Sequence, residues 1–288
     1  LRLSRGLGDV YKRQMISVSR KNIEKFKKEG IYKSKKLNIR SFKVYGDGAL
    51  GSRGAVLKRP YCDDPHNYGI LRTSAEDLKF YAKEIAEMGF QMNTHAIGDS
   101  TVSVLLNEYK KILKDIDDPR WRIEHSQVVD INEFELYNEK ILPSIQPTHA
   151  TSDMYWAYDR LGSRIKGAYA FKDLLNSSSR VALGTDFPVE KVNPFHTFYS
   201  SVERKDLSGY PENGFQMENS LTREETLKGM TIWGAYFNFE EHEKGSLEVG
   251  KSADFIVLNQ NIMEVEADLI PMTEVIRTYI DGELVYSK

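Results

Sequence analysis

Cysteine is nearly absent from this sequence: Cys62 is the only one among 288 residues, so no disulfide bond can form within the chain. Such a composition is typical of a reducing compartment, and we expect a cytoplasmic protein. No apolar run is long enough to cross a bilayer, so we expect no membrane partner. The net charge is only −2, with both signs mixed along the chain, which argues against a nucleic-acid partner.

Two motifs of other enzyme classes are also missing. The sequence has no G-x-S-x-G elbow, and Cys62 lies in a loop rich in Pro and Asp without an assigned activating partner. The Gly-rich stretch GDGALGSRG at 46–54 does not lead directly into a helix, so it is a poor cradle for phosphate. These absences argue against a serine or cysteine nucleophile and against a phosphate-binding barrel.

Residues 1–14, LRLSRGLGDVYKRQ, do not resemble part of a fold. They are similar to translated adapter sequence of the kind that contaminates assembled metagenomic reads, and a natural basic N-terminal tail is the alternative. We therefore set them aside as a non-native tail when inferring the fold. If they are foreign, the natural protein began upstream.

From residue 39 onward, strand-like segments alternate with helix-like segments. The strands are expected at 39–46, 90–96, 121–126, 141–149 and 180–186, and the helices near 73–89, 99–114, 130–140, 168–177, 193–204 and 222–238. Strands that alternate with helices indicate βαβ units and a parallel sheet. We predict an α/β fold in which residues 15–239 form a partial TIM-type (β/α)8 barrel. A complete barrel has eight strands in about 250 residues, so five strands also predict an N-terminally truncated chain.

The last part of the sequence changes character. The segment GKSADFIVLN at 250–259 and the residues around Asp281-Gly282 indicate short antiparallel strands and a hairpin. We predict a small β-domain at 240–288 that packs beside the barrel as one half of a β-sandwich, with an unpaired edge.

Four of the expected strands end in a potential metal ligand: Lys43, His95, His125 and Asp186. The carboxyl ends of barrel strands meet on one face, so four separate segments can deliver ligands to one point. Imidazole and carboxylate are the usual ligands of zinc and similar divalent ions. Taken singly, each residue could also have a purely structural role. His95 and His125 could be hydrogen-bonded structural histidines, Asp186 could cap the next helix, and Lys43 could pair with Asp47. Their joint occurrence predicts a divalent metal site.

Six motifs in order, KVYGDGALGSRGA, THAIGD, RIEHSQ, QPTH, LGTDFPVE and GKSADFIVLN, together resemble the amidohydrolase superfamily, specifically amidohydrolase family 3, the YtcJ-like branch. The resemblance covers residues 39–288 and places the five strands at barrel positions 4–8. It implies that Lys43 is a candidate carboxylated bridging ligand, that His95 and His125 are metal ligands, and that Asp186 is both ligand and general base. The superfamily's first-strand H-x-H motif, which supplies two further ligands, is absent from this sequence.

The function we predict is metal-dependent hydrolysis of a carbon–nitrogen bond, foremost an amide in a small-molecule substrate. One or two divalent ions, zinc foremost, would polarise the carbonyl and activate water. Asp186 would act as the general base, and His125 or His149 would stabilise the oxyanion. For His149 a purely structural role is the alternative, and for Asp153 beside it we favour loop packing over a place at the pocket mouth.

The competing interpretation is a catalytically inactive partial barrel that lacks the H-x-H ligands and binds metal weakly or not at all. We expect the 288-residue chain itself to bind divalent metal poorly and to hydrolyse little, because zinc sites need three or four protein ligands. A homodimer is a further expectation.

Overall fold

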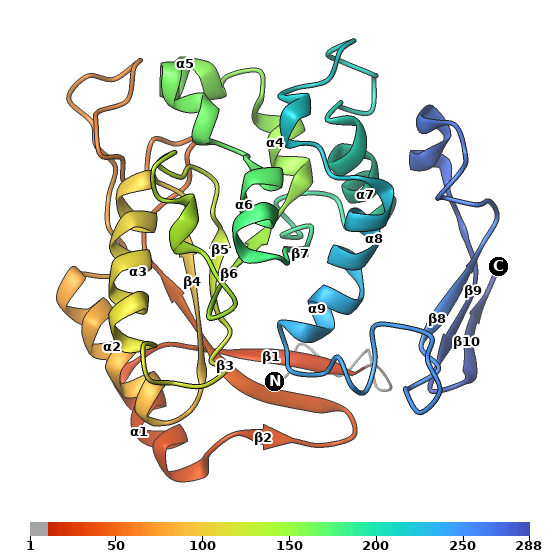
Figure 1. Cartoon of the computed structure of the whole chain (residues 1–288), viewed down its shortest axis with the longest axis horizontal. Coiled ribbons are helices and arrows are strands. Elements are labelled where there is room, and N and C mark those ends of the chain that lie inside the picture. The colour runs from red at the N-terminus through yellow and green to blue at the C-terminus, as the bar shows by residue number, and fades with distance from the viewer. Residues whose placement is uncertain (1–10) are drawn as a thin grey trace.

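The computed structural model describes residues 11–288, and its central feature is a curled β-sheet that is almost entirely parallel (Figure 1). Six strands run parallel in the order β1-β3-β4-β5-β6-β7, and the short β2 pairs antiparallel with β3. Their bounds are β1 (Lys12–Ser17), β2 (Tyr32–Lys33), β3 (Leu37–Tyr45), β4 (Gln91–Ala96), β5 (Trp121–His125), β6 (Ile141–Ile145) and β7 (Ala182–Leu183). The predicted α/β class is confirmed, with the sheet curled as half of a barrel.

The strand β1 was missed by the sequence analysis. Its first three residues, Lys12, Arg13 and Gln14, belong to the segment that we set aside, yet β1 pairs with β3 from Lys12 to Ser17. The strand gave little sequence signal because it buries only Ile16 fully, so it lacks an apolar alternation. The domain boundary that we expected after residue 14 therefore falls inside a strand. Residues 1–10 lie outside the described part of the chain, and their origin stays a prediction.

Helices cover the outer face of the sheet and cap the carboxyl ends of its strands (Figure 1). Their bounds are α1 (Arg20–Glu29), α2 (Ala75–Glu87), α3 (Asp99–Ile112), α4 (Pro147–Asp153), α5 (Ala157–Leu161), α6 (Phe171–Ser178), α7 (Pro194–Glu203), α8 (Arg223–Met230) and α9 (Ile232–Tyr236). The main core lies between α2, α3 and the sheet, where Phe42, Ile85 and Leu106 are fully buried. No helix within residues 11–288 combines the length and the apolar character needed to cross a membrane.

Local capping explains why α2 and α8 begin where they do. The Ser74 hydroxyl accepts a hydrogen bond from the Asp77 backbone N–H, and Thr222 forms a reciprocal capping box with Glu225. These contacts satisfy backbone N–H groups that the first turn leaves free. The predicted start of both helices is confirmed to within a residue or two.

The helix expected at 130–140 is wrong, because the structure has only a 3-10 turn, Phe134–Leu136, in this segment. The side chain of Asp130 accepts a hydrogen bond from the Asn132 backbone, and Asn138 accepts one from Lys140. Such local contacts compete with helical hydrogen bonds.

The helix expected at 222–238 is divided into α8 and α9. The break falls at Thr231, whose backbone is non-helical and whose hydroxyl donates to the Leu227 carbonyl. This side-chain bond to the preceding turn accompanies the change of direction between the two helices.

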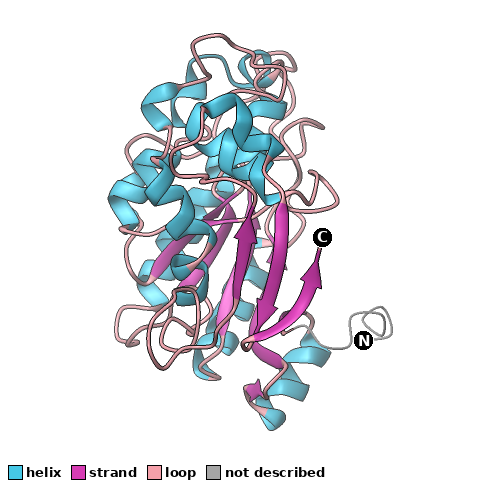
Figure 2. Cartoon of the chain, turned by 90° about the vertical axis from the view of Figure 1, so that its right-hand side faces the viewer, coloured by secondary structure: helices cyan, strands magenta, loops and turns pink. Residues whose placement is uncertain are grey.

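A small antiparallel sheet follows beside the barrel (Figure 2). Its strands are β8 (Phe255–Leu258), β9 (Val275–Ile280) and β10 (Glu283–Ser287), in the order β10-β9-β8. Asp281 and Gly282 both have positive φ and close the predicted hairpin between β9 and β10. The segment between β8 and β9 packs Ile262 and Ile270 against Phe198 of α7. Within residues 11–288 this region is one layer rather than the two layers of a sandwich.

Candidate metal centre

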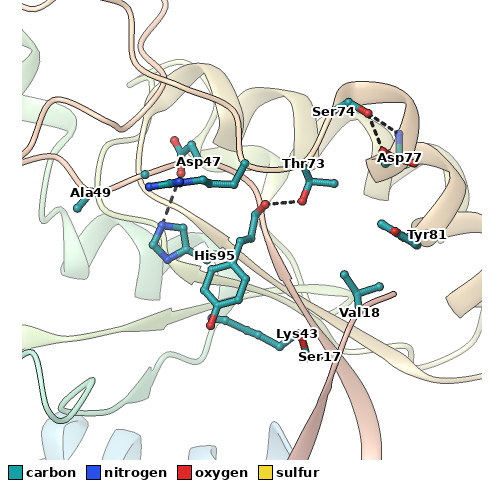
Figure 3. Close-up of a pocket in the computed structure, with 13 residues that line it drawn as sticks. Ser17, Val18, Lys43, Asp47, Ala49, Thr73, Ser74, Asp77, Tyr81 and His95 are labelled. Carbon is teal, nitrogen blue, oxygen red and sulfur yellow. Dashed lines mark hydrogen bonds and ion pairs between the residues drawn. The ribbon is translucent and has the colours of Figure 1, made fainter. Parts of the chain in front are cut away.

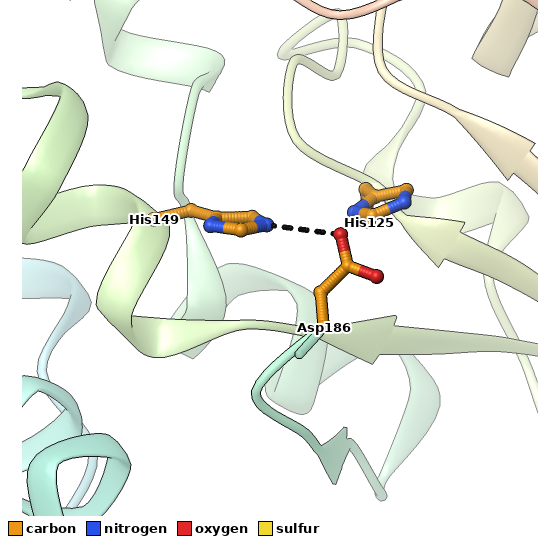
Figure 4. Close-up of side chains that lie close together, drawn as sticks. All are labelled: His125, His149 and Asp186. Atoms are coloured by element: carbon orange, nitrogen blue, oxygen red, sulfur yellow. Dashed lines mark ion pairs between the residues drawn. The ribbon is translucent and has the colours of Figure 1, made fainter. Parts of the chain in front are cut away.

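Two histidines and an aspartate meet at the carboxyl edge of the parallel sheet (Figure 4). One potential ligand atom from each of His125, His149 and Asp186 lies within 4.8 Å of the other two. His125 is the last residue of β5, His149 lies in α4 just after β6, and Asp186 follows β7. Neighbouring parallel strands end at the same edge, which is why residues so distant in sequence meet here.

The backbone is strained at two of these three residues. His125 has φ 75° and Asp186 has φ 55°, the left-handed region that residues with a Cβ seldom occupy. Such a conformation costs on the order of 1–3 kcal/mol and persists where the surrounding structure enforces it. In both places the chain turns sharply at the strand end and leaves the side chain at the rim of the sheet. The strain therefore coincides with the positions that would carry function.

His149 occupies a different position from the one expected for it. The strand predicted to end at His149 ends at Ile145, and Pro147 begins α4. The ring lies between two carboxylates, with Nε2 3.6 Å from Asp186 Oδ2 and Nδ1 3.1 Å from Glu190 Oε1. The sequence motifs predicted no metal-binding role for His149 and no role for Glu190. The only signal for Glu190 was its place at the end of the motif LGTDFPVE, four residues after Asp186.

The other two predicted ligands lie one and two strands further along the same edge. The His95 ring packs edge-on against the His125 ring, with 4.5 Å between the ring centroids. His95 and Lys43 both line a cavity of about 650 Å³ at the ends of β1, β3 and β4 (Figure 3). The structure thus brings His125 and Asp186 together with His149, and it places His95 and Lys43 beside that cluster.

Asp47, which the sequence offered as an alternative partner for Lys43, instead binds backbone N–H groups. Its carboxylate accepts hydrogen bonds from the backbone N–H groups of Val56, Ile97 and Gly98, at 2.9, 3.0 and 2.9 Å. It ties the long loop after β3 to the turn between β4 and α3. Lys43 is left facing the cavity, where burial lowers the pKa of its ammonium group.

Electrostatics act in opposite directions on the three imidazoles: His95 and His125 are held neutral, whereas His149 is held in its charged form. Burial, reinforced by the charge of Lys43, lowers the pKa of His95 to about 4, and burial together with His95 and Lys43 lowers that of His125 to about 3. Burial acts in the same direction on His149, but the carboxylates of Asp186 and Glu190 outweigh it and raise its pKa to about 9. Burial opposes ionisation of Asp186, yet its contact with His149 gives a net lowering of its pKa.

Two buried nitrogen atoms of the imidazoles lack hydrogen-bond partners in the described part of the chain, although His95 Nε2 lies 3.8 Å from Asp47 Oδ1. His95 Nε2 and His125 Nδ1 are both buried without a hydrogen-bond partner among residues 11–288. A buried polar atom left unpaired costs about 1–3 kcal/mol, and a bound ion is one recognised explanation. Two imidazoles and a carboxylate are a common ligand set for a catalytic divalent ion such as zinc. The arrangement therefore offers donor atoms of the chemical kind that a divalent ion takes.

A parallel half barrel with histidine and carboxylate donors at its carboxyl edge has the architecture of a metal-binding barrel enzyme. Comparison with known sequences gives the family: a profile described as "Amidohydrolase family" matches residues 9–286, and the chain belongs to this family. The match includes β1 and the small antiparallel sheet.

Individual relatives agree with this assignment. The chain is 33% identical over 252 residues to the putative amidohydrolase YtcJ of Bacillus subtilis, covering 86% of this chain and 47% of that protein. It is 31% identical over 263 residues to Protein LONG AFTER FAR-RED 3 of Arabidopsis thaliana, covering 90% and 45%. An N-substituted formamide deformylase of Arthrobacter pascens is 21% identical over 223 residues, covering 75% and 40%. The chain spans about half the length of the curated relatives it matches.

Among solved structures, an uncharacterized metal-dependent hydrolase from Pyrococcus horikoshii is similar, with a TM-score of 0.78 and 26% identity. The match covers 92% of this chain and 54% of that one. The similarity therefore extends over nearly all of the chain described here.

Proposed function

We propose that this chain contributes the site of a metal-dependent hydrolase that cleaves an amide-type carbon–nitrogen bond in a small molecule. The observation that carries the proposal is the meeting of His125, His149 and Asp186 at the carboxyl edge of the sheet. Membership of the amidohydrolase family and the formamide substrate in one relative's name support the choice of bond.

The residues that would hold one divalent ion, zinc foremost, are His125, His149 and Asp186. A second ion would use His95 and Lys43, provided that Lys43 is carboxylated, and the burial that favours its neutral amine supports that reaction. The bound metal supplies Lewis-acid polarisation of a carbonyl and activation of water near neutral pH.

The protein's own part in the reaction centres on Asp186. Its ionised carboxylate can take the proton of the attacking water at one oxygen and return it to the leaving nitrogen. His125 stays neutral, held by burial. Stabilisation of the oxyanion by His149 would need a proton on Nε2, and that atom cannot carry a proton while it binds an ion. We favour the ligand role for His149, because its ring lies within the cluster of donor atoms.

A second candidate function is metal binding without turnover, and two observations favour it. The sequence has no H-x-H motif, and within residues 11–288 the parallel sheet is open, with β1 and β7 at its edges. A site missing part of its wall would hold an ion but would position substrate poorly, because catalysis requires geometry accurate to about 0.5 Å.

The experiment that tests the proposal is zinc titration of the metal-stripped 288-residue chain, followed by assays with N-substituted formamides and small acyl amides. We expect zinc to bind, and Asp186→Ala and His125→Ala to weaken it. Turnover that requires zinc and is lost in Asp186→Asn would support the hydrolase. Zinc binding without turnover would favour the second candidate, and failure to bind zinc would contradict both.

A further inference from the structure

A single turn after β7 presents two carboxylates to one imidazole. Asp186 and Val189 are joined by a backbone hydrogen bond of 2.9 Å, and Glu190 follows directly. Asp186 approaches His149 at Nε2 and Glu190 approaches it at Nδ1, so the turn encloses the ring from both sides. Nothing in the proposed mechanism uses Glu190.

We propose that Glu190 is a positioning residue: it accepts the Nδ1 proton of His149 and thereby fixes the ring with Nε2 directed toward His125 and Asp186. This inference rests on the proposed function, because it assigns Glu190 a role in organising that same metal site. The carboxylate acts through His149 and does not itself touch the cluster of donor atoms.

The contacts of Glu190 suit it to this role. Its Oε1 lies 3.1 Å from His149 Nδ1 and accepts a second hydrogen bond, of 2.7 Å, from the Ser152 hydroxyl. Ser152 lies three residues after His149 in α4, so the helix that carries the imidazole also holds the carboxylate in place. The Glu190 side chain is 19% exposed, and bulk water therefore competes only partly for the contact.

The chemical consequence concerns which nitrogen carries the proton. A neutral imidazole has one donor and one acceptor nitrogen, and a carboxylate at Nδ1 keeps the proton there. A metal ion at Nε2 must displace the other proton of the charged ring, and the lone pair of Nε2 is then free to bind the ion. A carboxylate behind a metal-bound histidine commonly fixes the orientation of the ring in this way, and its loss typically lowers metal affinity about 10- to 100-fold.

The first test needs no metal. Long-range ¹H–¹⁵N correlation spectra of the metal-free 288-residue chain are recorded above the His149 pKa of about 9, where the ring is neutral, with His149 assigned by comparison with His149→Gln. They show whether Nδ1 carries a protected proton. We expect that proton in the wild type and in Glu190→Gln, whose amide oxygen can still accept it, and its loss in Glu190→Ala. A wild-type spectrum with Nδ1 unprotonated, or an unchanged spectrum in Glu190→Ala, would overturn the inference.

The second test measures zinc affinity by competition with a chromophoric chelator. We expect Glu190→Ala to weaken binding about 10- to 100-fold and Glu190→Gln to retain most of the affinity. Glu212→Ala is the control, because it removes an exposed carboxylate of the same charge outside the cluster and should leave affinity unchanged. Equal losses in Glu190→Gln and Glu190→Ala would indicate a charge effect and would contradict positioning.

The two tests separate this inference from the proposed function. A wild-type chain that shows the His149 proton but binds no zinc would leave Glu190 as an anchor of the ring and would refute the metal site. A chain that binds zinc with the same affinity in wild type and Glu190→Ala would preserve the site and refute the positioning role. Circular dichroism and thermal melting of each variant exclude unfolding as the cause of any loss.

Discussion

At the scale of single residues, the site depends on side chains whose role cannot be inferred from the neighbouring sequence alone. His149 lies in a helix, has carboxylates at both ring nitrogens, and meets residues from two other strand ends. Its character as donor, acceptor or ligand follows from those neighbours and not from the motif QPTH.

One substitution distinguishes a metal-ligand role of His149 from a role in stabilising the oxyanion. We expect His149→Ala to lower zinc affinity by more than about 100-fold, because removal of a ligand should cost more than loss of an outer-shell partner. Competition with a chelator measures the change. Unchanged affinity with a loss confined to kcat would instead assign His149 to the oxyanion.

Asp153 gives a pH-dependent prediction. Its Oδ2 accepts hydrogen bonds from the Tyr169 hydroxyl at 2.8 Å and from Gln127 Nε2 at 3.2 Å. Asp153 therefore packs against its neighbours, but from the end of helix α4 and not from the loop that we expected. Burial nevertheless raises its pKa from 3.8 to about 6. The folded state therefore binds a proton more tightly than the unfolded state, and the contribution of Asp153 to stability falls as pH rises from 4 to 6.

The variant Asp153→Asn isolates this effect. Relative to the variant, we expect the wild type to lose up to about 3 kcal/mol of unfolding free energy between pH 4 and pH 7, from a pKa difference of about two units. Urea denaturation of both proteins at several pH values measures the difference. A difference independent of pH would show that Asp153 titrates normally.

At the scale of elements, Asp47 joins the long loop after β3 to the turn before α3. This contact between the loop and the turn also requires glycine at position 98, because a Cβ there would lie 2.1 Å from the Val56 carbonyl oxygen. Leu57 and Tyr61 of this loop are buried in the core. The loop is therefore an ordered part of the cavity wall that contains Lys43 and His95.

Removal of the Asp47 carboxylate should destabilise the fold strongly. We expect Asp47→Ala to cost about 3–5 kcal/mol, because three backbone N–H groups lose their acceptor and each unpaired buried donor costs about 1–3 kcal/mol. Chemical denaturation measures the loss. Asp115→Ala, at an exposed position, is the control and should change stability by less than about 0.5 kcal/mol.

At the scale of the whole molecule, distant segments are joined through the buried carboxylate of Glu240. It accepts hydrogen bonds from the Tyr11 hydroxyl, Arg13 Nε and Asn38 Nδ2, at 2.6, 2.5 and 2.9 Å. The chain after α9 is thereby attached to β1 and β3. These contacts make Tyr11 and Arg13 part of the fold, although the sequence suggested a foreign tail.

A double-mutant cycle tests that attachment. We expect Arg13→Ala and Glu240→Ala to be coupled by about 0.5–3 kcal/mol in unfolding free energy, as is typical of residues in one ion-pair network. Additive effects of the two substitutions would show that the ion pair between Arg13 and Glu240 contributes little to the attachment.

Much of the architecture could be predicted because its signals are local. Alternation of apolar and β-branched residues marked β3, β4 and β5, capping residues marked α2 and α8, and Asp281-Gly282 marked the hairpin. The failures also have local causes. β1 lacks an apolar alternation, and side-chain contacts to the backbone replaced the helix expected at 130–140.

The sequence by itself determined the fold class, the family and the approximate positions of five strands, because periodicity, capping and motif order are properties of neighbouring residues. Only the tertiary structure decided which of those residues meet. It brought His149 into the cluster with His125 and Asp186, placed Glu190 behind it, and assigned Asp47 to the backbone instead of to Lys43. These outcomes depend on strand order, sheet curvature and sharp turns at positive φ, which set distances between residues that are far apart in the chain.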